Sequence, residues 1–375
     1  MLQSIFVYSL LVIVMLSSTS MYARSSRSLL LTIEENKIRS VLFYFPILFF
    51  AIVFGMRYGV GGDHLQYLSR YEDIGRGKEL NGEVLFNWVT AIFSRNGMHF
   101  VLYFSFLAFV QILLLFLSFK KEPYLLPFLI FVLFTGGYYL TWMNVIRQCL
   151  VLCMFIYSIK FIRLQKFVPF ISIILIGIFI HKSAIILILV YPILKGERDF
   201  FKNRAIQFLL LTFAFIMRGF EAWMNSFGDL NSLLLFFGYK KYSLDQINSL
   251  QVAADTGIGV ILVFLIDIII IIYSTKLKNT FKNSNFIIFY NLYFAGRFLS
   301  LLFFGSILFQ RPLLYFFTLK LVVVSYLLYY LSKNFKTKFN TLIFMILVSC
   351  YFLLFIGLLS KGEFNTSKFV FFWDI

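Results

Sequence analysis

Long apolar runs recur along the whole sequence of 375 residues, and they limit the chain to folds that a lipid bilayer can hold. A membrane-spanning helix needs about 20 mostly apolar residues. We identify twelve runs of roughly 14–25 residues, which are residues 2–22, 40–56, 98–119, 124–140, 142–163, 167–180, 182–195, 203–223, 256–275, 284–305, 311–332 and 341–360. The sequence therefore predicts an all-α, polytopic integral membrane protein with about 12 transmembrane helices. The segment 84–94 is too short to span, and we expect a short interfacial helix there.

The composition agrees with this class. Hydrophobic residues make up 61% of the chain and charged residues 14%, whereas soluble domains have about 45–50% apolar and about 25% charged residues. These values exclude a soluble enzyme, a disordered chain and a nucleic-acid-binding domain. No internal repeat or Pro-rich or Gly/Ser-rich linker divides the sequence, so we expect a single polytopic domain over residues 1–375.

The net charge of +17 is explained by where the Lys and Arg residues fall relative to the membrane. The first run has no basic residue before it and a basic cluster after it (Arg24, Arg27, Lys37, Arg39), which is the reverse of a cleaved signal peptide. We assume that the N-terminus lies outside and that successive runs cross the membrane in opposite directions. The inside loops then hold 19 Lys and Arg residues in total; these loops are 23–39, 120–123, 160–166, 195–204, 276–283 and 333–340. The outside segments 57–97, 224–255 and 361–375 hold only 9. Basic residues favour the cytoplasmic side, so both termini are predicted to be extracytoplasmic.

Charged residues inside a membrane are costly, at about 2.5–3.5 kcal/mol each on insertion scales, and often mark function. Arg57 follows the second run and precedes three glycines and the pair Asp63–His64. Glycines allow tight turns and expose amide groups that can bind an anion. The alternative is an ordinary Gly-rich turn with an arginine at the membrane surface.

Two further groups lie at the predicted outer level. Arg147 is five residues into the fifth run, where its alternative role is that of a structural partner for a carboxylate. His181 divides the apolar stretch 167–194, and an imidazole there can act as an acid or a base. The alternative for His181 is a polar turn without chemistry.

The later runs add Arg297 and Arg311, of which Arg311 could also be an interfacial anchor. Arginine binds phosphate through two hydrogen bonds and keeps its charge. Arg57, Arg147, Arg297 and Arg311 at one membrane face therefore suit a lipid-linked phosphate or pyrophosphate, and Asp63 or His181 could deprotonate an attacking hydroxyl. Asp267 and Lys320 lie within runs and could pair with each other. The three histidines lack metal-site spacing, so no metal is expected.

Four stretches carry a family resemblance: RYGVGGDHLQYLSRYEDI from Arg57, NVIRQCLVLCMFIYSIKFI around Arg147, FISIILIGIFIHKSAIILILVYPI around His181, and QRPLLYF around Arg311. The order and context of these stretches resemble those of the Wzy-type repeat-unit polymerases of bacterial O-antigen and exopolysaccharide synthesis, in the EpsG-like branch. One position departs from the family pattern, because His64 stands where Tyr is usual.

The resemblance implies a glycosyltransferase of the bacterial plasma (inner) membrane. Such an enzyme transfers a growing glycan from undecaprenyl pyrophosphate onto an incoming lipid-linked repeat unit at the outer face, without a cofactor. Its partners would be undecaprenyl-pyrophosphate-linked oligosaccharide, the bilayer, a chain-length regulator and a flippase, with no nucleic acid. We expect Asp63, His181 and Arg147 to be catalytic, and the four arginines above to bind pyrophosphate.

Substrate binding is assigned to two regions. His64 and Tyr67 lie in the first outer loop, and the loop 224–255 carries Tyr239, Lys240 and Tyr242, whose side chains suit sugar binding. The alternative for the second loop is a plain connection. Two other functions remain open on the residues alone: an O-antigen ligase, which uses the same donor, and a flippase or exporter of lipid-linked oligosaccharide.

Overall fold

The computed structural model describes residues 2–26, 33–79, 82–217, 258–304, 307–361 and 369–374. The described chain is helical, apart from one isolated antiparallel bridge between Arg57 and Phe371. It divides into two compact units, each of which is described by itself. Unit 1 comprises residues 1–158, 172–181 and 328–375, and unit 2 comprises residues 159–171 and 182–327.

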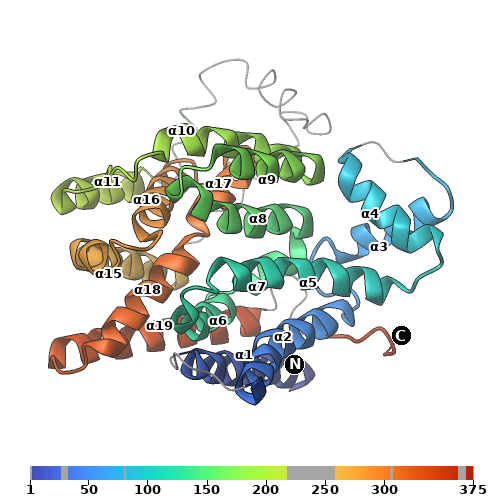
Figure 1. The fold of residues 1–375 in the computed structure, drawn as a ribbon, viewed down its shortest axis with the longest axis horizontal. Coiled ribbons are helices and arrows are strands. Elements are labelled where there is room, and N and C mark those ends of the chain that lie inside the picture. Colours follow the sequence, from blue (N-terminus) through green and yellow to red (C-terminus); the bar gives the residue numbers. More distant parts are fainter. Residues whose placement is uncertain are drawn as a thin grey trace. The chain divides into compact units, whose positions relative to one another are not determined.

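Unit 1 contains the helices up to the middle of α8, together with the end of α9 and the C-terminal helix. They are α1 (Leu2–Ser25), α2 (Ile33–Gly55), α3 (His64–Gly75), α4 (Val84–Arg95), α5 (Phe100–Ser118), η1 (Pro123–Leu125), α6 (Leu126–Thr135), α7 (Tyr138–Asn144), α8 (Ile146–Arg163), α9 (Phe167–Ile180) and α19 (Lys338–Lys361). Helix α2 packs along α5 and α1, and α1 also contacts α6. Helices α3 and α4 pack side by side near the end of α5 (Figure 1).

Unit 2 contains η2 (Lys182–Leu189), α10 (Val190–Leu194), α11 (Arg204–Ile216), α15 (Ile258–Thr280), α16 (Phe286–Leu302), α17 (Ile307–Phe317) and most of α18 (Lys320–Lys333). Helix α16 packs against α17, α11 and α15. The Ser183 and Tyr315 hydroxyls are 3.0 Å apart and join η2 to α17. Asn203 directly precedes α11 and caps its N-terminus, because its Oδ1 accepts hydrogen bonds from the amides of Ala205 and Ile206.

Six described helices are long and apolar enough to cross a membrane: Gln3–Ser25, Glu34–Gly55, Phe100–Ser118, Ile258–Thr280, Phe309–Lys333 and Lys338–Ser360. A bent pair, Pro123–Thr135 with Tyr138–Asn144, brings the number to 7 if it forms one span. These segments fall on seven of the predicted apolar runs, so the expectation of an all-α, multi-pass membrane protein is confirmed. Shorter apolar helices occupy four more runs. The count of about 12 spans stays a prediction.

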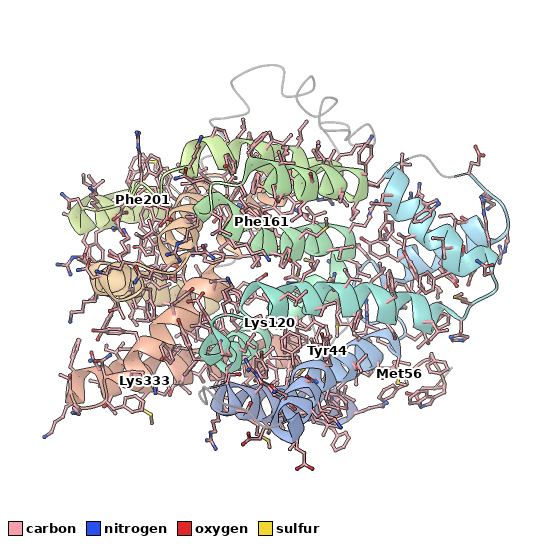
Figure 2. The ribbon with its side chains drawn as sticks, in the orientation of Figure 1. Tyr44, Met56, Lys120, Phe161, Phe201 and Lys333 are labelled. Carbon is pink, nitrogen blue, oxygen red and sulfur yellow. The ribbon has the colours of Figure 1, made fainter. Side chains whose placement is uncertain are left out.

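The long helices expose apolar side chains as lipid-facing helices do. Phe6 and Ile13 on α1 are 67% and 61% exposed, and Val41 on α2 is 62% exposed. Figure 2 shows carbon-rich side chains directed outward along this part of unit 1, around the labelled Tyr44. In lipid this arrangement is favourable, because the surrounding acyl chains are as apolar as the side chains.

Two breaks between α6 and α8 determine the positions of Asn144 and Arg147. Helix α6 ends at Gly136–Gly137, where Gly137 has a φ of 74°, and the chain bends by 68° into α7. A left-handed φ of this kind favours glycine. Helix α7 then ends at Asn144, and α8 begins at Ile146, so Asn144 and Arg147 lie beside an interruption in the helix. The predicted segment 84–94 is helical, as α4. Its position at the membrane interface stays a prediction.

The close packing of α2 on α5 makes Gly55 a test of the fold. A Cβ at Gly55 would lie 2.7 Å from the Val101 carbonyl oxygen and 2.8 Å from the Ser105 amide nitrogen, both of which are backbone atoms of α5. We expect Gly55→Ala to lower the free energy of unfolding by about 1–3 kcal/mol through overpacking. The measurement is the thermal unfolding midpoint of the purified protein in detergent.

Gly357→Ala is the matched control, because a Cβ at Gly357 on α19 meets nothing within 4 Å. Alanine is a better helix former than glycine by about 1 kcal/mol, so this variant should keep or raise the midpoint. Equal midpoints for Gly55→Ala and the wild type would contradict the α2–α5 packing.

Candidate functional site

Arg57 lies just after α2 and is fully buried. Its guanidinium donates hydrogen bonds to the carbonyl oxygens of Phe54, Val60 and Met143, the last two at 3.1 Å. The same group lies over the Phe54 ring, 3.8 Å from the ring centroid. These contacts tie the loop after α2 to α7, and they favour a structural role for Arg57.

The Gly-rich loop after Arg57 folds back on itself and on α7. Gly59 and Gly61 have positive φ values of 64° and 98°, and a Cβ at Gly61 would come within 3.0 Å of the Met143 carbonyl oxygen. The Gly59 amide donates to His64 Nδ1 at 3.2 Å, and the Asp63 amide donates to Asn144 Oδ1 at 2.8 Å. Several of the amides that could have bound an anion therefore bind within the protein. A C-terminal segment supports the same loop, since the Tyr58 amide donates to the Val370 carbonyl oxygen at 2.8 Å.

His64 is fully buried, and its Nδ1 accepts the hydrogen bond from Gly59. Burial lowers the pKa of His64, and the nearby charge of Arg57 lowers it further, to about 3. His64 is therefore neutral at physiological pH. Its geometry suits a structural acceptor in the loop.

The cluster that could support chemistry centres on Glu83, which directly precedes α4. One Glu83 oxygen lies 2.6 Å from Arg147 in the first turn of α8, and the other lies 3.1 Å from His181 Nδ1, just after α9. The side chains are partly open, with exposed fractions of 28% for Arg147, 16% for His181 and 12% for Glu83. All three belong to unit 1. We call Glu83, Arg147 and His181 the carboxylate cluster.

Helix α3 adds aromatic and basic groups to this cluster. Arg147 Nε lies 3.5 Å from the Tyr67 hydroxyl, and the Arg147 guanidinium lies 5.6 Å from the Tyr67 ring centroid. Arg70 donates to Asn87 Oδ1 of α4 at 3.1 Å through its Nε. Burial lowers the pKa of Arg70, and the like charge of Arg147 lowers it further. The charges of Arg70 and Arg147 therefore act on each other, and arginine side chains suit an anion because their donors form charge-assisted hydrogen bonds with it.

The charge of Glu83 is set by its neighbours. Burial alone would raise its pKa, but the hydrogen bond with His181 and the charge of Arg147 outweigh burial and lower the pKa to about 2. Glu83 is therefore ionised throughout the physiological range. An ionised carboxylate can fix the orientation of an imidazole through Nδ1.

The structure brings several of the predicted site residues together. Tyr67, Arg147 and His181 meet in the carboxylate cluster or at its edge, and the Asp63 amide is bound to Asn144, three residues from Arg147. Glu83 and Arg70 were not singled out from the sequence. The only signal for Glu83 was a lone acid at the start of an apolar helix, which does not reveal partners 64 and 98 residues away.

Arg297 and Arg311 lie in unit 2. Arg297 Nε is 2.7 Å from Asp267 Oδ2, and Lys320 Nζ is 2.6 Å from Asp267 Oδ1, so the pairing expected for Asp267 and Lys320 is found. Tyr293 also donates a hydrogen bond to Asp267. Arg311 is half-buried on α17. Two cations thus surround one fully buried carboxylate within this unit.

Other predicted residues fall elsewhere. Tyr239, Lys240 and Tyr242, with the loop 224–255, lie outside the described residues. Within the residues that are described, no group of three or more His, Cys, Asp or Glu side chains could hold a metal ion.

The depressed pKa of Glu83 predicts a pH dependence of stability. A carboxyl group whose pKa falls on folding, here from 4.5 to about 2, stabilises the fold above its unfolded pKa. That contribution is lost as the pH falls from 4.5 towards 2. The difference in unfolding midpoint between the wild type and Glu83→Gln should therefore be large at neutral pH and shrink across this acidic window. The control is Glu72→Gln, which removes an exposed carboxylate of α3. If the difference in unfolding midpoint between the wild type and Glu83→Gln did not change with pH, the pairing of Glu83 with Arg147 and His181 would be contradicted.

Comparison with known proteins adds one match. Residues 40–370 match the EpsG family. No curated protein and no solved structure matches the chain. The family match covers far more than half of the sequence and includes Arg57, Glu83, Arg147 and His181. The chain therefore belongs to the EpsG family, a family of membrane proteins linked to exopolysaccharide biosynthesis.

Proposed function

We propose that the chain is a polysaccharide polymerase that transfers a growing glycan from undecaprenyl pyrophosphate onto an incoming lipid-linked repeat unit at the outer face of the plasma membrane. The observation that carries the proposal is the carboxylate cluster, in which Glu83 joins Arg147 at 2.6 Å and His181 at 3.1 Å. It combines a candidate base with a fixed cation, and glycosyl transfer from a pyrophosphate uses both.

At the anomeric carbon of the donor sugar, the reaction makes one bond and breaks one. The acceptor hydroxyl oxygen bonds to the anomeric carbon of the donor sugar, and the bond from that carbon to the pyrophosphate oxygen breaks. The pyrophosphate leaves with the electron pair of the broken bond, while the hydroxyl proton passes to a base. A base near the acceptor and positive charge near the leaving group lower the barrier at the two points where charge develops.

We assign the base to His181. Glu83 Oε1 accepts a hydrogen bond from Nδ1 of the ring in the corresponding tautomer, so Nε2 carries the lone pair that takes the proton. Glu83 is then a positioning residue that also stabilises the protonated ring. Asp63 is the alternative base: its amide donates to Asn144 Oδ1, and its charge acts on Tyr67 at the edge of the cluster.

We assign the leaving group to Arg147, with Arg70 as its neighbour. Arginine suits pyrophosphate because its planar fork of donors matches two oxygens and it stays charged. The Arg147 side chain is 28% exposed, and its guanidinium is held by Glu83 at 2.6 Å and by the Tyr67 hydroxyl at 3.5 Å. Arg57 differs, since it is fully buried against backbone carbonyls. We therefore propose that Arg57 positions the loop and Tyr67 rather than binding pyrophosphate.

The remaining assignments are separate proposals. Arg297 and Arg311 are proposed to bind phosphate groups within unit 2. The loop 224–255, with Tyr239, Lys240 and Tyr242, is proposed to select the acceptor sugar. A ligase would use the same base and cation with another acceptor, so only the product distinguishes it from a polymerase.

Removal of Arg147 tests the role of the cluster. We expect Arg147→Ala to reduce polymer formation by about 100-fold or more, because loss of one preorganised charge-stabilising group typically has that effect. The measurement is the length distribution of surface polysaccharide in cells that carry only the variant gene. The ladder should collapse to a single repeat unit on its acceptor, while the protein remains inserted at the normal level.

Arg76→Ala is the matched control. Arg76 also pairs with a glutamate, Glu72 at 3.5 Å, but its side chain is 70% exposed at the end of α3. This variant should give normal chain lengths. Normal chain lengths in Arg147→Ala would contradict the proposal, and long polymer that accumulates on the lipid carrier in cells lacking the gene would indicate a ligase instead.

A further inference from the structure

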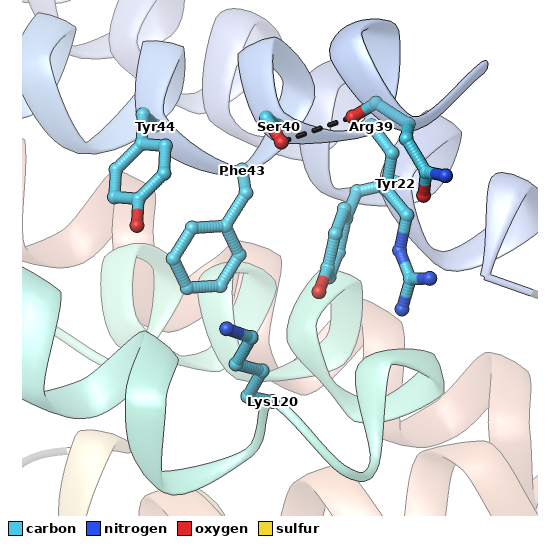
Figure 3. Close-up of a pocket in the computed structure, with 7 residues that line it drawn as sticks. Tyr22, Arg39, Ser40, Phe43, Tyr44 and Lys120 are labelled. Atoms are coloured by element: carbon cyan, nitrogen blue, oxygen red, sulfur yellow. Dashed lines mark hydrogen bonds between the residues drawn. The ribbon is translucent and has the colours of Figure 1, made fainter. Parts of the chain in front are cut away.

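A second polar site lies in unit 1, at the opposite end of α2 from Arg57. It is a pocket of about 280 Å³ (Figure 3), lined by Tyr22, Asn36, Arg39, Ser40, Phe43, Tyr44 and Lys120. Its lining comes from the last turns of α1, the first turns of α2 and the residues just after α5. The proposed glycosyl-transfer reaction uses none of these residues.

Two cations from different segments reach into this pocket. The Arg39 guanidinium carbon lies 5.7 Å from the Tyr22 ring centroid, and Lys120 Nζ lies 5.8 Å from the Phe43 ring centroid. Figure 3 shows the Lys120 ammonium directed towards the Phe43 ring. Among the described residues, neither cation forms an ion pair with a carboxylate, and the pocket lining contains no Asp or Glu.

The other lining groups add hydrogen-bonding capacity and an apolar wall. Ser40 Oγ donates to the Asn36 carbonyl oxygen at 2.9 Å, which holds the hydroxyl at the rim, as the dashed line in Figure 3 shows. The Phe43 ring is buried at the base, with 3% exposure. Two cations without an ion-pair partner among the described residues favour a phosphate group, because phosphate oxygens accept charge-assisted hydrogen bonds.

The position of the pocket relative to the candidate membrane spans indicates that the phosphate belongs to a lipid headgroup. Its lining lies at the ends of three candidate spans, Gln3–Ser25, Glu34–Gly55 and Phe100–Ser118, which is the level of lipid headgroups. Beside it, α2 exposes an apolar stripe at helical spacing: Val41 (62%), Phe45 (49%), Leu48 (50%) and Ile52 (47%). Such a stripe offers a surface for an acyl chain that continues from the pocket.

We propose that this pocket binds the phosphate of an anionic phospholipid, with Arg39 and Lys120 on the headgroup and the α2 stripe along an acyl chain. The distribution of basic residues predicts that this end of α2 is cytoplasmic, and anionic lipids are enriched in that leaflet. A bound headgroup would bridge α2 to the segment after α5 and offset the repulsion between the two cations.

The test is native mass spectrometry of the full-length protein in a neutral detergent, titrated with phosphatidylglycerol or phosphatidylcholine. The variant is Arg39→Ala/Lys120→Ala. The control is Lys37→Ala/Lys121→Ala, which removes the same charge from positions two and one residues away that do not line the pocket. The first variant should bind phosphatidylglycerol roughly 10-fold or more weakly than the wild type, since each cation contributes to anionic lipid attraction.

The control variant should bind phosphatidylglycerol within roughly twofold of the wild type, because it leaves both cations of the pocket lining in place. Phosphatidylcholine should bind weakly and equally to all three proteins. Equal losses of phosphatidylglycerol binding in the two variants would overturn the site. Displacement of phosphatidylglycerol by inorganic phosphate at the same concentration would overturn its assignment to a lipid.

Discussion

The carboxylate of Glu83 has two partners that come from distant parts of the sequence, Arg147 at 2.6 Å and His181 at 3.1 Å. The first lies at the start of α8, just after a break in the helix, and the second lies where α9 ends. Without the carboxylate, Arg147 would lose its ion-pair partner, and the imidazole would lose the group that orients its ring. The candidate site therefore depends on one ion-paired group whose charge is maintained at physiological pH.

Around that cluster, contacts with backbone atoms hold the loop after α2 in place. Arg57 donates to the carbonyl oxygens of Phe54, Val60 and Met143, so that a buried charge replaces a regular hydrogen-bond ladder where α2 ends and the loop begins. Asn144 binds the amide that starts α3. These contacts place Tyr67 of α3 against Arg147. A cation in the membrane region thus need not bind substrate, and its burial and partners distinguish the two roles.

The membrane-spanning helices were predictable from the sequence, because hydrophobicity over about 20 residues is a strong local signal. The break at His181 was also predictable, because polar residues in apolar runs are costly. Glu83 was not, since it sits in a polar loop where acids are common and its partners are far along the chain. Local patterns also gave no indication that Arg57 is fully buried or that Asp267, whose pairing with Lys320 was expected, also pairs with Arg297. Tertiary contacts decide these points, and hydropathy does not encode them.

The proposed mechanism requires that Glu83 act through His181 in glycosyl transfer. The most direct measurement is the rate of chain extension by the purified full-length protein on lipid-pyrophosphate-linked repeat units, for Glu83→Gln, His181→Ala and the double variant. If both residues serve one proton transfer, the double variant should lose no more activity than the more impaired single variant, because groups that act as a unit are strongly non-additive. Losses that multiply in the double variant, or full activity in Glu83→Gln, would contradict the account.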